Sequence, residues 1–375
     1  MFPGLADWIK MLLAFAVSLL VAYVMTPPVK RFAEKVGAID VPRDNRRVHD
    51  HPIPRMGGLA IFIGFMLSLI FFVPMSTKVT GLLVGSVIIA VMGGVDDIVS
   101  LNPWVKLAGQ IVAALVAIRC GLVFDVISNP NIFAEETYIE IGWLSIPLTM
   151  LWIVGCTNAV NLIDGLDGLA VGVSAISSLT MMVVSIFVAD PNTTFILAAV
   201  CGACVGFMPY NLNPAKIFMG DVGSQFLGFV LACVSIMGLF KLHTVITFLV
   251  PVLAMAIPLA DTVFAFCRRI LHGQSPFHAD KGHFHHRLLA MGLNQKQAVA
   301  VLYGVSAVMG LVAVLLTGKD TLQRIICVVA AFVISLVVWL YVFWKGPKHK
   351  GAEHASSGAP ETPQAAQDGK AADKT

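Results

Sequence analysis

Charged side chains are scarce in this chain. Asp, Glu, Lys and Arg together make up 13% of its 375 residues, whereas soluble domains typically carry about 25%. Hydrophobic residues account for 57%, and the mean hydropathy is +0.84. Because so few polar side chains cannot cover a soluble globule, the composition excludes a soluble protein. It predicts an all-α polytopic membrane protein.

Cysteine pairs are also missing. Seven cysteines fall mostly inside apolar runs, and the single C-x-x-C, formed by Cys201 and Cys204, has no second pair nearby. Cysteines in this setting are typical of small buried residues, not of a disulfide framework or a cysteine-bound metal.

Long apolar segments recur along the chain and predict about eleven transmembrane helices. They cover residues 8–27, 56–75, 80–95, 105–124, 144–161, 169–189, 194–211, 223–241, 245–266, 299–317 and 324–344. The first segment ends in Thr26-Pro27-Pro28 with no small-residue cleavage site after it. It therefore predicts a retained helix and not a removed signal peptide.

Positively charged residues are divided unequally between the two sets of loops. Nineteen of the 25 Lys and Arg residues fall on one side, in the loops 28–55, 96–106, 211–222 and 267–298 and in the tail after 344. The positive-inside rule places that side in the cytoplasm, with the N-terminus outside and the C-terminus inside.

No soluble domain and no clear internal repeat is visible. From about Lys345 the chain consists mainly of Ala, Gly, Ser, Pro, Gln and Lys, a composition that cannot bury a core. We therefore expect an integral-membrane domain over residues 1–344 and a disordered cytoplasmic tail over residues 345–375.

Five clusters of polar residues lie on the same predicted side of the bilayer. They are Arg43–Arg55, Asp96–Asp97, Asn161–Asp167, Phe218–Ser224 and His278–Arg287. Ionisable residues are unfavourable in the membrane and usually mark a functional site there. Their gathering on one side predicts a catalytic face at the cytoplasmic boundary.

The pair Asp96–Asp97 ends the third apolar segment, directly after two glycines. Two adjacent carboxylates at a membrane boundary can bind a divalent cation, or one can stay basic because its neighbour raises its pKa. A solvated helix end is an equally good explanation of an isolated pair. Lys106 lies ten residues after Asp96 and can return to the same site.

Two Asp-Gly steps, at Asp164 and Asp167, follow Asn161 in the loop between the fifth and sixth segments. Two carboxylates three residues apart bring oxygen ligands together, and the glycines allow close backbone approach. The loop is too short for an EF-hand and lacks its closing Glu. A structural turn is the alternative, since Asp-Gly is common in turns.

The segment Phe218–Ser224 precedes the eighth apolar segment. Its glycines and the amide groups of a helix start can face a phosphate, and Asp221 can hold Mg²⁺ beside that phosphate. Phe218 offers a flat apolar face for a base, although a phenylalanine taken alone is more often core or lipid-facing.

The densest cluster, His278–Arg287, holds four of the ten histidines. A zinc site and a solvated polar loop are possible explanations. The lack of thiolates and the cations Lys281 and Arg287 favour recognition of a diphosphate.

Together these strings resemble the polyprenyl-phosphate N-acetylhexosamine-1-phosphate transferases, integral-membrane enzymes of bacterial cell-envelope biosynthesis. The matching strings appear in family order and are Pro54–Gly58, Asp96–Asp97, Asn158–Ala170, Phe218–Ser224 and His283–Arg287. The resemblance implies transfer of N-acetylglucosamine-1-phosphate from UDP-N-acetylglucosamine to undecaprenyl phosphate, with release of UMP. It also implies a bacterial plasma-membrane location with the active site facing the cytoplasm.

The resemblance further implies roles for individual residues. Asp221 would be the ligand of Mg²⁺, or of Mn²⁺ in its place. The catalytic set would be Asp96 and Asp97, which would bind or deprotonate the lipid phosphate, and Asp164 near the metal and diphosphate. The substrate-binding set would be Phe218 and Asp167 at the uracil, His283, His285, His286 and Arg287 at the diphosphate or sugar, and also Arg55, Lys106 and Asn161.

Within the resemblance, the His-x-His-His form is similar to enzymes that accept UDP-N-acetylglucosamine. The strings Arg46–His49, Pro54–Gly58 and Ala279–Lys281 look closest to the teichoic-acid linkage-unit enzymes of Gram-positive bacteria. The alternative is the sister branch that accepts UDP-N-acetylmuramoyl-pentapeptide, which shows three consecutive histidines followed by an acid.

A membrane transporter is the alternative from another class. It predicts charges near mid-span on discontinuous helices, and Asp261 is the clearest residue of that kind. The partners expected for the transferase are its two substrates and the bilayer, with no nucleic acid. Family members often dimerise, so the resemblance is compatible with a homodimer but leaves the oligomeric state open.

Overall fold

Helices make up nearly all of the regular structure. The computed structural model describes residues 4–41, 51–124, 126–128, 138–188, 191–238, 249–271 and 283–317, with Ile326 and Val329. The first half contains α1 (Leu5–Val36), β1 (Ile39–Asp40), β2 (Ile53–Pro54), α2 (Gly58–Phe72), α3 (Thr77–Val99), α4 (Pro103–Arg119), β3 (Val126–Ser128) and β4 (Tyr138–Glu140). It is followed by the 3-10 helix η1 (Gly142–Leu144), α5 (Ser145–Leu162), α6 (Leu169–Val188), α7 (Pro191–Asn211), α8 (Gly220–Gly238), α9 (Leu249–Ala254), α10 (Ala256–Leu271), α11 (Phe284–Ala290) and α12 (Gln295–Leu315).

Seven of the described helices are long and apolar enough to cross a membrane. They are α1, α3, α5 with η1, α6, α7, α8 and α12. Helix α2 is apolar but only 15 residues long. The chain is therefore an all-α multi-pass membrane protein. Apart from Ile326 and Val329, the predicted segment 324–344 and the tail 345–375 lie outside the described residues.

Helix α8 lies at the centre of the bundle. All its residues from Val222 to Gly238 are buried, and α2, α3, α5 and α6 pack against it. Small residues allow this close packing: a Cβ atom at Gly228 would lie 2.7 Å from the carbonyl oxygen of Cys156 in α5. Neighbouring helices therefore fix the position of the first turn of α8.

The first helix is longer than the sequence predicts. The expected end at Thr26-Pro27-Pro28 is wrong, because α1 continues through both prolines to Val36 and ends at Gly37 in a left-handed conformation. Each proline removes one backbone N–H from the helix, and its ring crowds the carbonyl of the preceding turn, but α1 is held along its length by α2 and α7. The Thr26 hydroxyl donates to the carbonyl of Ala22, 2.6 Å away, which keeps that polar group satisfied inside the helix.

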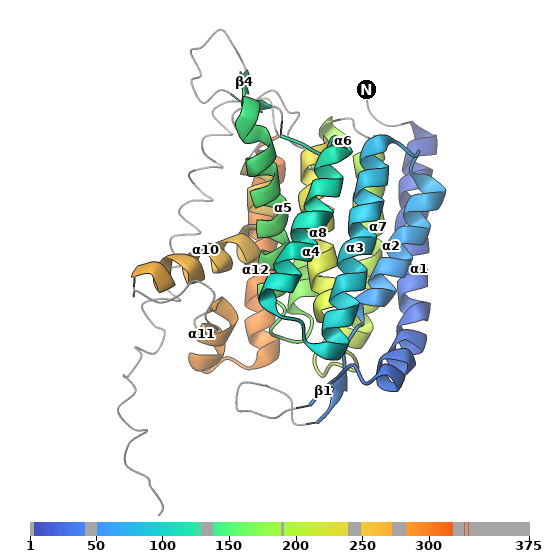
Figure 1. Cartoon of the computed structure of the whole chain (residues 1–375), viewed down its shortest axis with the longest axis vertical. Coiled ribbons are helices and arrows are strands. Elements are labelled where there is room, and N and C mark those ends of the chain that lie inside the picture. The colour runs from blue at the N-terminus through green and yellow to red at the C-terminus, as the bar shows by residue number, and fades with distance from the viewer. Residues whose placement is uncertain are drawn as a thin grey trace, which may run out of the picture.

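The sequence predicts one span over 245–266, but the described part of this segment forms two helices. Helices α9 and α10 are separated at Met255. Pro258 has no N–H to donate to the carbonyl of Ala254, and the Ser177 hydroxyl of α6 donates to that carbonyl instead, at 2.6 Å. In Figure 1, α10 runs across the direction of the bundle and away from it.

The two small antiparallel ladders lie at opposite ends of the bundle. Strand β1 pairs with β2 near the C-terminal end of α1, and β3 pairs with β4. Figure 1 shows β1 and α11 at one end and β4 at the other, together with the start of α1. The candidate site lies at the end that carries β1 and α11.

Candidate active site

The site begins where α3 ends beside the start of α8. A Cβ atom at Gly93 of α3 would lie 2.6 Å from the Cα of Val222, so the two backbones are nearly in contact. This brings the buried Asp97 carboxylate to the α8 terminus, where it accepts from the N–H groups of Asp221 (2.9 Å) and Val222 (3.2 Å). A carboxylate is favoured there because the first amides of a helix lack partners within the helix.

Two cations neutralise the carboxylates. The Lys106 ammonium is 2.5 Å from Asp96 and 2.8 Å from Asp221. The Arg55 guanidinium lies 3.3 Å from Asp97 and 3.8 Å from Asp221. The structure thus places Lys106 beside Asp96, as the spacing predicted, and joins three of the five clusters through ion pairs.

Amide side chains complete the surroundings of Asp221. Asn161 donates to Asp221 (3.2 Å) and to the hydroxyl of Ser224 (2.8 Å), and Gln225 donates to Asp221 at 3.0 Å. Deeper in the bundle Gln110 hydrogen bonds to Gln225 and to Asn158. Sequence reasoning missed Gln110, Asn158 and Gln225 as supports of the site, although amides within apolar segments were a usable signal.

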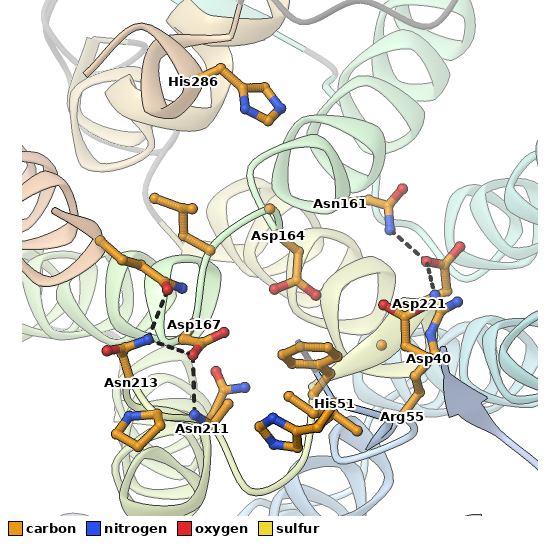
Figure 2. Close-up of a pocket in the computed structure, with 18 residues that line it drawn as sticks. Asp40, His51, Arg55, Asn161, Asp164, Asp167, Asn211, Asn213, Asp221 and His286 are labelled. Atoms are coloured by element: carbon orange, nitrogen blue, oxygen red, sulfur yellow. Dashed lines mark hydrogen bonds and ion pairs between the residues drawn. The ribbon is translucent and has the colours of Figure 1, made fainter. Parts of the chain in front are cut away.

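A cavity of about 490 Å³ opens beside this group. Its wall includes seven of the predicted residues: Arg55, Asn161, Asp164, Asp167, Phe218, Asp221 and His286. Figure 2 shows the Asp164 carboxylate projecting into the cavity, with Asp221 on one side and Asp167 on the other. The structure therefore brings residues from all five predicted clusters to one place.

Asp164 lies in the loop between α5 and α6. Burial raises the pKa of its carboxyl group to about 8; the negative charge of Asp221 adds to this effect and the positive charge of Arg55 opposes it. Near neutral pH the group is therefore largely protonated until a further positive charge arrives. This property suits a carboxyl group that exchanges a proton for a cation.

Asp167 is held by the loop that follows α7. One of its oxygens accepts from the Asn213 side chain (2.9 Å) and from the Ala215 N–H (3.1 Å), and Asn213 also donates to Gln295 at 2.7 Å. Sequence reasoning missed these residues, and with them Asp40, His51 and Asn211 in the cavity wall. Their positions depend on contacts between distant loops, which no local pattern reveals.

The members of the histidine cluster differ in their exposure. Within the described residues His286 is the member that forms part of the cavity wall, while His283 and His285 are buried and Arg287 follows on α11. Burial, together with the adjacent His286, lowers the pKa of His285 to about 3. A neutral His285 can form hydrogen bonds but cannot pair with a phosphate as a cation. His278 and Lys281 lie outside the described residues, as do Arg46, Arg47 and His49.

A protein cage for a metal is not formed by the part of the chain that the structure describes. No three His, Cys, Asp or Glu side chains there come together with ligand geometry. Mg²⁺ is nevertheless often bound by one or two carboxylates and by substrate phosphates. Asp221 and Asp164 border the same cavity and supply hard oxygen ligands, so the donor set fits Mg²⁺.

Comparison with known proteins gives the family. The sequence model of glycosyl transferase family 4 matches residues 79–239. A relative from Bacillus subtilis (strain 168), described as a probable undecaprenyl-phosphate N-acetylglucosaminyl 1-phosphate transferase, is 43% identical over 309 residues, which are 82% of this chain and 85% of the relative. The chain belongs to glycosyl transferase family 4.

Two further relatives each match more than two thirds of the chain. A decaprenyl-phosphate N-acetylglucosaminephosphotransferase from Mycobacterium tuberculosis (strain H37Rv) is 33% identical over 350 residues, 85% of this chain and 86% of the relative. A phospho-N-acetylmuramoyl-pentapeptide-transferase from Staphylococcus haemolyticus is 34% identical over 275 residues, 69% of this chain and 83% of the relative. The matched family region contains the site from Asp96 to Asp221 and ends before α11.

Proposed function

We propose that this family 4 member transfers N-acetylglucosamine-1-phosphate from UDP-N-acetylglucosamine to undecaprenyl phosphate. The products are undecaprenyl-diphosphate-N-acetylglucosamine and UMP, and the reaction is the first membrane step of teichoic acid or another cell-envelope glycan. The observation that carries the proposal is the group formed by Asp221, Asp96 and Asp97 with Lys106 and Arg55. It stands beside a cavity in a chain that is 43% identical to a relative named for this activity.

The chemistry exchanges one phosphorus–oxygen bond for another. An oxygen of the lipid phosphate attacks the sugar-linked phosphorus, and the bond to the bridging oxygen breaks. UMP leaves with the electron pair. The acceptor phosphate is largely ionised near neutral pH, so positioning and neutralisation of charge provide most of the catalysis.

Each predicted residue has a proposed part in this reaction. Asp221, with Asp164 nearby, would hold Mg²⁺ or Mn²⁺, which when bound neutralises the diphosphate charge. Asp96 and Asp97 are proposed to hold Lys106 and Arg55 in place on the acceptor side. When substrate binds, its phosphates would compete with these carboxylates for the two cations. Phe218 and Asp167 are proposed to contact uracil, Asn161 to orient Asp221, and His286 with the rest of the His283–Arg287 motif to contact the diphosphate or sugar.

The proposal includes the finer topology. The number of eleven spans rests on the apolar segments of the sequence. An outer N-terminus, a cytoplasmic C-terminus and an active site facing the cytoplasm are supported by the excess of Lys and Arg on one side. The shorter helices α2 and α4 would add to the seven long ones. The predicted segments 245–266 and 324–344 would complete the number, and each is described only in part. A membrane domain over 1–344, a tail over 345–375 and a homodimer complete the proposal.

The test measures UMP release by the purified protein with Mg²⁺ and undecaprenyl phosphate, with one donor at a time. We expect UMP with UDP-N-acetylglucosamine and none with UDP-N-acetylmuramoyl-pentapeptide. EDTA should stop the release and added Mg²⁺ should restore it. Release only with the second donor would assign the chain to the pentapeptide branch, and no release with either donor would contradict the transferase proposal.

A further inference from the structure

Asp261 is a buried carboxylate outside the cavity. It lies on α10 with 3% of its surface exposed. One oxygen is 2.7 Å from Nδ1 of His283, and the other accepts from the backbone N–H of Phe284 at 2.8 Å. A single carboxylate on one helix thus binds two consecutive residues at the start of another.

Helix α11 depends on such contacts. It has seven residues and no capping hydrogen bond from the side chain of His283, its N-cap residue. A helix this short is not stable alone in water. The first free N–H of α11 is satisfied by Asp261 from α10, and the rings of Phe264 and Phe284 pack edge to face beside it at 5.7 Å.

The contacts continue from Asp261 to the cavity. The His283 ring stacks on His285 with centroids 5.8 Å apart and planes 5° apart, and His285 lies 4.3 Å from His286. The Nε2 side of the His285 ring lies against Gly165, where an added Cβ atom would collide with it. His286 and Gly165 both belong to the cavity wall.

We propose that Asp261 is a positioning residue for the histidine motif, fixing the ring of His283 and, through α11, the place of His286 in the cavity wall. The inference rests on the proposed function, because it concerns how the motif meets the donor. An ionised carboxylate can only accept at this contact, so the proposal places a hydrogen on Nδ1 of His283 and, where the ring carries a single hydrogen, leaves Nε2 as the acceptor. This pairing also gives Asp261, the residue that best fitted a transporter, a place in a transferase site.

The decisive variant is Asp261→Asn. Its oxygen can still accept from Phe284, but its amide would donate to Nδ1 and move the ring hydrogen of His283 to Nε2. We expect kcat for UMP release to fall by about 10–100-fold, as for other partners that orient a functional histidine. The KM for undecaprenyl phosphate and the unfolding temperature should change little. Thr262→Val is the matched control, since among the described residues the Thr262 hydroxyl donates to the carbonyl of Pro258 within its own helix.

A spectroscopic measurement tests the inference without activity. In protein labelled with ¹⁵N-histidine, the resonance that disappears in His283→Gln identifies the ring, and its nitrogen shifts report the tautomer. We expect the Nδ1–H form in the wild type and the Nε2–H form in Asp261→Asn. An Nε2–H form in the wild type, or equal loss of kcat in Asp261→Asn and Thr262→Val, would overturn the inference. Failure of the wild type to release UMP would instead count against the proposed function and leave the tautomer result unaffected.

Discussion

Polar side chains from four parts of the sequence contact the carboxylate of Asp221. Arg55 lies before α2, Lys106 is on α4, Asn161 on α5 and Gln225 on α8 itself. This convergence makes Asp221 the residue at which a lost charge should affect the chemistry most. Folding should be less affected, because Lys106 keeps Asp96 and Arg55 keeps Asp97 as partners.

The first prediction concerns Asp221→Asn. UMP release should fall by about a hundredfold or more, since one charge that organises the transition state is removed. The unfolding temperature should stay within a few degrees of the wild type. Asp7→Asn, in the first turn of α1 and away from the cavity, is the control and should keep full activity. A normal rate of UMP release in Asp221→Asn would contradict a role for Asp221 in the reaction.

The second prediction concerns Asp164 and pH. Its pKa is raised from 3.8 to about 8 in the folded protein, so the native state binds more protons than the unfolded state between these values. The contribution of Asp164 to stability is therefore present below pH 4 and is lost as the pH rises through about 8. In metal-free protein, Asp164→Asn should flatten the fall of the unfolding temperature over this range. An identical pH profile in wild type and variant would show that the carboxyl group of Asp164 has an ordinary pKa.

The residues that the sequence predicts well are those whose unusual place is visible along the chain. Asp96, Asp97, Asp164 and Asp221 interrupt or border apolar segments, and an acidic residue there needs a reason. Asn213 and Gln295 belong to the site only because the loop after α7 meets the start of α12. Asn-Pro in a loop is an ordinary turn signal, so its sequence gives no sign of this contact.

At the scale of elements, the close approach of α3 and α8 sets the geometry of the site. Glycine at position 93 lets the α3 backbone reach Val222, which places Asp97 at the first amides of α8. Neighbouring pairs of helices are brought together in the same way, as with Gly228 against α5. The carboxylates therefore depend on small residues that have no chemistry of their own.

The third prediction compares two glycine substitutions. In Gly93→Ala the new Cβ would lie 2.6 Å from Val222 Cα, so the helices must separate, at a loss of about 1–3 kcal/mol of stability. UMP release should fall as well. In Gly155→Ala, on α5, nothing lies within 4 Å of the new atom, and the protein should be unchanged or slightly more stable. The unfolding temperatures of the two variants test this prediction. Equal stability of Gly93→Ala and Gly155→Ala would contradict the packing argument.

Helix ends were the part of the fold that local patterns predicted least well. Pro27 and Pro28 suggested an end to α1, but the helix continues through them to Val36, packed along α2 and α7. At Pro258 the lost bond does coincide with a break, and Ser177 from α6 satisfies the exposed carbonyl. Whether a proline ends a helix is thus decided by tertiary partners, which the sequence does not display.

At the scale of the whole molecule, the cavity is lined by residues of β1, α11 and the loops near them. Figure 1 shows β1 and α11 at one end of the bundle and β4 with the start of α1 at the other. A transferase with a soluble nucleotide donor and a lipid acceptor needs such an arrangement, because the two substrates arrive from different phases. The excess of Lys and Arg favours the cytoplasm for the site end.

The fourth prediction tests this orientation. Green fluorescent protein fused after Thr375 should fluoresce in cells, because the C-terminus is expected in the cytoplasm. Alkaline phosphatase fused at the same point should be inactive, because it requires the oxidising outer side. The reverse pair of results would place the site on the outer face and contradict the supply of a cytoplasmic nucleotide sugar.

The central claim is that a phosphosugar, and not the sugar alone, is transferred. It is tested most directly with UDP-N-acetylglucosamine carrying ³²P in the phosphate next to the sugar, incubated with the protein, Mg²⁺ and undecaprenyl phosphate. Our account predicts that the label moves into the lipid fraction in step with UMP release, and that Asp221→Asn prevents both. Label that stays in water-soluble UDP while the sugar enters the lipid would contradict it.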